Sequence, residues 1–158
     1  MGRDFGPALF LYEGDLMLLS SLFSWDHLHP ILVHFTTALL PVSVVTDVFG
    51  KFTDRYSLTP AAWWMLLYGA IATPLTALAG WMWATDIEKL TGSEAGSILT
   101  IHEWLGISLV IGFLSLTIWR ARIFMLAKKP GIIYFVFAVL VIGALMYQGY
   151  LGGRMTLG

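Results

Sequence analysis

The residues of this chain best suited to chemistry are its histidines, His27, His29, His34 and His102. Neutral imidazole is a ligand for metal ions and for haem iron. His34 lies about one helical turn inside a long apolar stretch, where an imidazole needs a partner, and His102 stands at the start of another such stretch with Glu103 beside it. The pattern therefore predicts a site to which more than one helix contributes a histidine.

Helix geometry limits which histidines can act together. At about 100° per residue, His29 and His34 point about 140° apart on one helix, so a ligand from another helix is needed. We therefore predict His34 and His102 as the two axial ligands of a b-type haem, a closed six-coordinate arrangement suited to electron transfer. Gly106 follows His102 by one turn and leaves room for a macrocycle or for another helix. Arg154 could pair with a haem propionate.

Two other hypotheses fit the same residues. His29, His34 and His102 could form a tris-imidazole site for copper or zinc. Alternatively, the chain is a structural or assembly subunit without a cofactor, in which His34 makes a hydrogen bond to a neighbouring helix. The last hypothesis is favoured by small residues that would permit close helix packing: Gly69, Thr73, Thr76, Ala77, Gly80, Gly143 and Ala144.

The elements that must position these residues are apolar helices. The chain is 58% hydrophobic and only 12% charged, a composition typical of membrane proteins. Stretches long enough to cross about 30 Å of hydrocarbon occupy residues 30–49, 61–84, 101–119 and 132–151. Because the connections are short, we predict an all-α, integral membrane, four-helix up-down bundle over 29–158. Residues 1–28 are predicted to form a short N-terminal interfacial segment.

Charge distribution predicts an orientation. The loop between the first two spans and the loop between the last two carry most of the basic residues: Lys51, Arg55, Arg120, Arg122, Lys128 and Lys129. By the positive-inside rule, both termini and all four histidines then lie outside the cytoplasm, in the periplasm if this is a bacterial inner-membrane protein. Asp47, the one intramembrane ionisable group in the cytoplasmic half, is predicted to pair with Lys51 four residues later.

Several function classes are excluded or disfavoured. A formal net charge of -1 gives no basis for binding nucleic acid. The absence of cysteine excludes disulfides, cysteine-ligated iron–sulfur clusters and covalently attached c-type haem. No Ser/His/Asp arrangement or phosphate-binding glycine loop is evident, so we do not expect a catalytic subunit on its own. No internal repeat is evident either.

The run His29-Pro30-Ile31-Leu32-Val33-His34-Phe35, together with His102 and Leu151-Gly152-Gly153, resembles the bacterial membrane family called domain of unknown function 2231. Thr36 stands where this family often has proline. The resemblance implies a four-helix membrane domain and, through its occurrence beside Rieske-type domains, a link to respiratory electron transfer. We therefore expect a small subunit of a respiratory or photosynthetic membrane complex, with haem b near the outer face. Its expected partners are the lipid bilayer, other subunits, and a periplasmic cytochrome or quinone.

Overall fold

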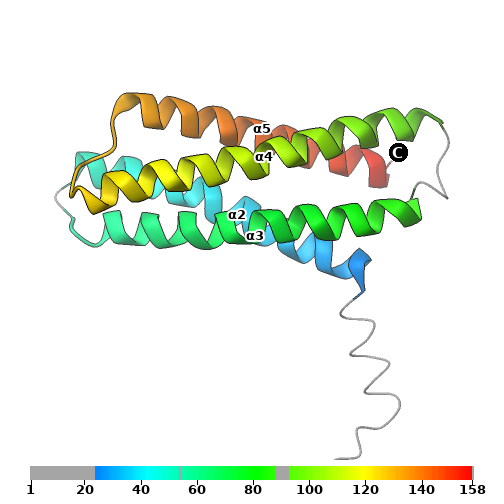
Figure 1. The fold of residues 1–158 in the computed structure, drawn as a ribbon, viewed down its shortest axis with the longest axis horizontal. Coiled ribbons are helices and arrows are strands. Elements are labelled where there is room, and N and C mark those ends of the chain that lie inside the picture. Colours follow the sequence, from blue (N-terminus) through cyan, green and yellow to red (C-terminus); the bar gives the residue numbers. More distant parts are fainter. Residues whose placement is uncertain (1–23, 54, 88–92, 158) are drawn as a thin grey trace, which may run out of the picture.

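A computed structural model describes residues 24–53, 55–87 and 93–157, and the described chain is almost entirely helical. Its helices, labelled as in Figure 1, are α2 (Trp25–Phe52), α3 (Leu58–Ile87), α4 (Ser93–Met125) and α5 (Ile132–Leu157). Most of the predicted interfacial segment lies outside the described residues.

Each helix is long and apolar enough to cross a membrane. The candidate spans are His27–Phe52, Leu58–Ala84, Gly96–Met125 and Ile132–Met155. The prediction of an all-α, four-helix integral membrane bundle is therefore confirmed. Its core is formed by side chains from all four helices, with Leu40, Leu66, Phe113 and Ala138 almost completely buried.

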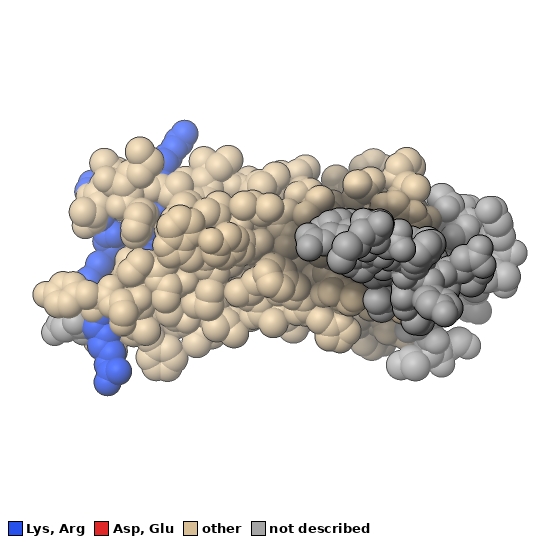
Figure 2. All heavy atoms as spheres, turned by 90° about the horizontal axis from the view of Figure 1, so that it is seen from below, with Lys and Arg blue, Asp and Glu red and all other residues tan. Residues whose placement is uncertain are grey.

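The helices alternate in direction, and each packs against its neighbours in the order α2, α3, α4, α5, with α5 returning to α2 (Figure 1). The starts of α2 and α4 and the ends of α3 and α5 lie at one end, which we call the histidine end. The short connections after Phe52 and after Met125 lie at the other, which we call the basic end. In Figure 2 the visible Lys and Arg side chains gather at the basic end.

Two helices extend beyond the predicted spans. α2 begins at Trp25, so Pro30 lies in its second turn and His29 is within the helix rather than at its cap. α4 continues to Met125, so Arg120 lies inside a transmembrane helix rather than in a loop. Both differences change the surroundings of ionisable residues.

Arg120 is fully buried and forms a two-point ion pair with Asp47 of α2. Its Nε and one terminal nitrogen donate to the two carboxylate oxygens at 2.6 and 2.8 Å, and the Tyr134 hydroxyl of α5 donates to Asp47 at 3.3 Å. The predicted Asp47–Lys51 pair is therefore wrong, because Lys51 instead lies over the Phe135 ring. The ion pair fixes α2, α4 and α5 to one another near the basic end.

Small residues permit the close packing of α2 and α3. A Cβ atom added to Gly69 would lie 2.6 Å from a methyl carbon of Leu40, a distance that real Cβ atoms do not reach. A side chain at this position would therefore displace the buried side chain of Leu40 from its place between the two helices.

The α2–α3 hairpin is repeated by the α4–α5 hairpin. Asp47 and Arg120 are 73 residues apart, and so are His29 and His102. With this shift, five buried positions of α2 fall on five buried positions of α4. The α2 set is Thr36, Leu40, Ser43, Val44 and Asp47, and the α4 set is Leu109, Phe113, Leu116, Thr117 and Arg120.

α3 and α5, the second helices of the two hairpins, match in the same way, with an interval one residue shorter than that between α2 and α4. Buried Ala62, Leu66, Gly69, Thr73 and Ala79 of α3 fall on buried Tyr134, Ala138, Val141, Leu145 and Leu151 of α5. His29 and His102 are therefore equivalent residues at one end, as Asp47 and Arg120 are near the other.

Candidate functional site

His29 projects from α2 onto α3. Its Nδ1–H donates to the carbonyl oxygen of Thr76 at 2.9 Å, and its ring lies 5.7 Å from the ring of Trp83. A Cβ atom added to Gly80 would lie 2.6 Å from Cε1 of His29, so the imidazole occupies the space that glycine leaves. Thr76, Gly80 and Trp83 share one face of α3, and this face determines how the imidazole is oriented.

His102 projects from α4 onto α5 in an equivalent way. A Cβ atom added to Gly152 would lie 3.3 Å from Cε1 of His102. The side-chain amide of Gln148 donates to the main-chain carbonyl oxygen of His102 at 2.9 Å. Gly80 and Gly152 are themselves equivalent positions of the two hairpins, so each histidine places the Cε1 edge of its ring against the same glycine of its own hairpin.

Both imidazoles lie at the histidine end, on helices that face each other diagonally across the bundle, and they are close enough to interact electrostatically. Because Nδ1 of His29 carries the proton that it donates to the Thr76 carbonyl oxygen, Nε2 of the neutral ring has no proton. The histidine end thus contains one imidazole from α2 and one from α4.

Two polar atoms of this region are buried without a partner. They are Nδ1 of His102 and Oε1 of Gln148. A buried polar atom without a hydrogen bond costs about 1–3 kcal/mol, and such atoms are rare in native proteins unless a ligand, water or ion binds them. Both atoms, like the second terminal nitrogen of Arg120 near the basic end, therefore stay available for a further hydrogen bond.

His34 lies elsewhere. It is exposed on the surface of α2, and its Nδ1–H donates to the carbonyl oxygen of Pro30 at 2.6 Å. No hydrogen bond, ring contact or electrostatic interaction links it to His102 in the part of the chain that the structure describes. The hydrogen bond predicted from His34 to a neighbouring helix is instead made within α2. The equivalent residue of α4 is Ile107, which is also exposed.

The remaining predicted site residues surround this region. Gly106 lies next to the Gln148 side chain, since an added Cβ atom would be 3.3 Å from Nε2 of that residue. Arg154 is exposed in the last turn of α5 at the histidine end. Among the described residues no group of three or more His, Asp and Glu side chains is arranged to hold a metal ion.

Sequence reasoning did not single out Gln148 with Gly152, or Thr76 with Gly80, as residues that position the histidines. The available signal was the spacing between the hairpins, since His29 with His102 and Gly80 with Gly152 recur at nearly the same interval. The two hairpins share too few residue identities for that interval to be noticed in the sequence alone.

Comparison with known proteins supports the membrane assignment and adds no activity. A search of the curated proteins and a search of the solved structures each found no match. The profile of one family, described as "Predicted membrane protein (DUF2231)", matches residues 26–158, which include all four helices apart from the first residue of α2. This protein belongs to the DUF2231 family of membrane proteins.

Proposed function

We propose that this protein is a small electron-transfer subunit of a membrane complex and that it holds b-type haem at the histidine end, with His29 and His102 as axial ligands. The observation that carries the proposal is that the imidazole of His29, oriented by its Nδ1–H bond to Thr76, and the half-buried imidazole of His102 lie at the same end of the bundle. This pair replaces the pair His34 and His102 that the sequence suggested.

The residues present fit a bis-imidazole site. Histidine ligands commonly donate Nδ1–H to a carbonyl oxygen, which fixes the ring and leaves Nε2 for the metal, and His29 already makes this bond to Thr76. Gln148 lies on α5, the helix next to His102, and its Oε1 is a buried hydrogen-bond acceptor to which no group of the described residues donates. A proton on Nδ1 of His102 would likewise leave Nε2 as the ligand atom.

When bound, haem would supply one-electron redox chemistry. The chain's own residues would orient the two imidazoles, with Gly80 and Gly152 leaving room for the rings beside α3 and α5. Arg154, in the last turn of α5 at the histidine end, would pair with a propionate.

The direct test is the composition of the purified full-length chain. We expect haem b, measured as the pyridine haemochrome, together with a low-spin Soret and α-band spectrum. Stoichiometric copper or zinc without haem would favour the metal-site alternative instead. Neither haem nor metal in protein expressed with sufficient haem supply would overturn the proposal.

A structural or assembly subunit is the second candidate. It is favoured by the hydrogen bonds that join His29 to Thr76 and Gln148 to His102, because both link neighbouring helices without any cofactor. On this alternative, changing either histidine lowers stability and has no spectroscopic consequence.

We further propose a bacterial inner-membrane location with the histidine end in the periplasm, because the described loop lysines and arginines gather at the opposite end. The chain has no cysteine, so single cysteines can be introduced at Ser57 and Ser93. A membrane-impermeant maleimide added to the periplasmic side should label position 93 and not position 57. Labelling of position 57 alone would reverse the orientation.

A further inference from the structure

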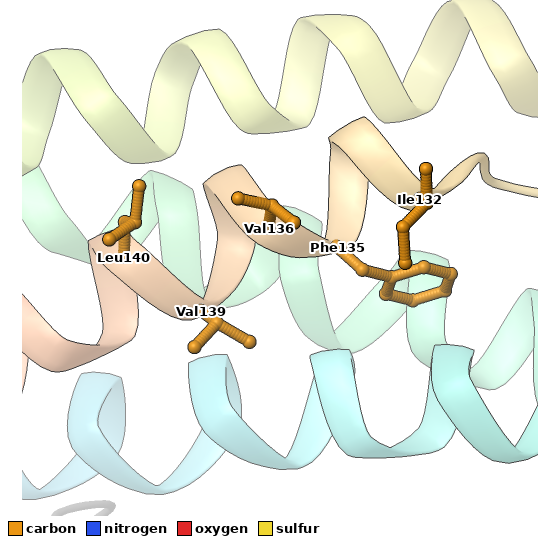
Figure 3. A pocket seen from close by; sticks show the side chains of 5 residues that line it. All are labelled: Ile132, Phe135, Val136, Val139 and Leu140. Atoms are coloured by element: carbon orange, nitrogen blue, oxygen red, sulfur yellow. The ribbon is translucent and has the colours of Figure 1, made fainter.

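An apolar groove runs along α5 from the basic end toward the middle of the bundle. It is lined by Ile132, Phe135, Val136, Val139 and Leu140, and almost no polar surface contributes to it. Figure 3 shows Phe135 and Val139 projecting on the side of α5 that faces α2. Val139 is 62% exposed, so its side chain is not covered by the protein itself.

Two ammonium groups stand at the end of this groove where α5 begins. Nζ of Lys51 lies 5.2 Å from the centre of the Phe135 ring, and Nζ of Lys129 donates to the main-chain carbonyl oxygen of Lys51 at 3.3 Å. No carboxylate of the described residues pairs with either lysine. Two positive charges therefore stand at the basic end of this apolar groove.

The equivalent position in the other half of the bundle carries no lysine. Phe124 of α4 corresponds to Lys51, and its ring stacks on Trp63 of α3 at 5.7 Å between centres. Trp63 corresponds in turn to Phe135. An uncharged aromatic pair thus stands on one side where a lysine lies over a ring on the other.

We propose that the apolar groove along α5 binds an anionic phospholipid, with one acyl chain along Val136, Val139 and Leu140 and the phosphate held by Lys51 and Lys129. Apolar lining accounts for the acyl chain, and the two ammonium groups, which no carboxylate of the described residues neutralises, account for the negative headgroup. The site is separate from the histidine end and does not depend on a cofactor.

The test is native mass spectrometry of the delipidated full-length protein titrated with phosphatidylglycerol or with phosphatidylcholine of the same acyl chains. We expect tighter binding of phosphatidylglycerol, and we expect Lys51→Gln to weaken it about fivefold, the effect of about one lysine at a membrane surface. Lys51→Gln keeps the main-chain oxygen that positions Lys129. Lys128→Gln is the matched control, because it removes the same charge at the same end of the bundle and should leave the affinity unchanged.

A second variant tests the groove itself. Val139→Trp fills it from an exposed position, so the bundle should keep its helix content while binding of both lipids weakens. Equal losses in Lys51→Gln and Lys128→Gln would show diffuse attraction in place of a site and overturn the proposal. Normal lipid binding by Val139→Trp would overturn the proposal as well. If the unmodified protein is a dimer and Val139→Trp is a monomer, the groove is occupied by a second copy of the chain instead of a lipid.

Discussion

Replacing Asp47 with leucine should destabilise the bundle by about 3–5 kcal/mol, the usual cost of leaving one member of a buried ion pair without its partner. Arg120 is fully buried, and its second terminal nitrogen already lacks an acceptor. Without Asp47, the guanidinium charge would therefore stay buried with no carboxylate to neutralise it. Unfolding in mixed micelles with increasing sodium dodecyl sulfate, followed by tryptophan fluorescence and circular dichroism, measures the change.

Two control variants show whether the lost stability comes from the buried ion pair. The double variant Asp47→Leu/Arg120→Leu removes both charges and should recover most of the lost stability, because well-packed apolar residues replace a buried pair at little cost. Lys51→Gln should change stability by less than about 0.5 kcal/mol, as expected for a surface charge. If Lys51→Gln destabilises the bundle as strongly as Asp47→Leu, the ion pair of Asp47 is with Lys51 after all.

Replacing either His29 or His102 with leucine should abolish the six-coordinate low-spin haem spectrum, since an axial ligand cannot be supplied by an aliphatic side chain. Each variant should still insert in the membrane, because leucine is more apolar than histidine. Absorption and electron paramagnetic resonance spectra of the purified variants, normalised to protein, provide the measurement.

His34→Leu is the matched control for these variants. It makes the same substitution on the same helix as His29→Leu, and it removes only a hydrogen bond within α2. We expect an unchanged spectrum. A spectrum lost in His34→Leu and kept in His29→Leu would restore the ligand pair inferred from the sequence and refute the pair proposed from the structure.

The fold could be predicted from the sequence because apolar stretches of membrane length constrain the chain so strongly. All four predicted spans fall within helices, and their order and alternating direction follow from the short connections. Helix ends were harder to predict, because hydropathy falls where charged residues begin even if the helix continues. Arg120 shows the consequence, since ending the third span at Trp119 placed the arginine in a loop and left Asp47 without its true partner.

The cofactor site stays a prediction. The sequence placed His29 and His102 at one end of the bundle, as the structure does, because the two spans that carry the histidines start on the same side. It could not distinguish His29 from His34, since both belong to one motif and the choice depends on which face of α2 packs on α3. The structure shows which face of α2 packs on α3, because His29 bonds to the Thr76 carbonyl oxygen and fits against Gly80, whereas His34 is exposed.

Ligand replacement tests the pairing of His29 and His102 most directly. His102→Gly opens a space next to Gly152, and free imidazole added to the purified variant should enter it and restore the low-spin six-coordinate spectrum. His29→Gly should respond in the same way next to Gly80, whereas His34→Gly should need no imidazole. Haem that stays six-coordinate and low-spin in both His29→Gly and His102→Gly without imidazole would contradict the assignment of these two residues as axial ligands.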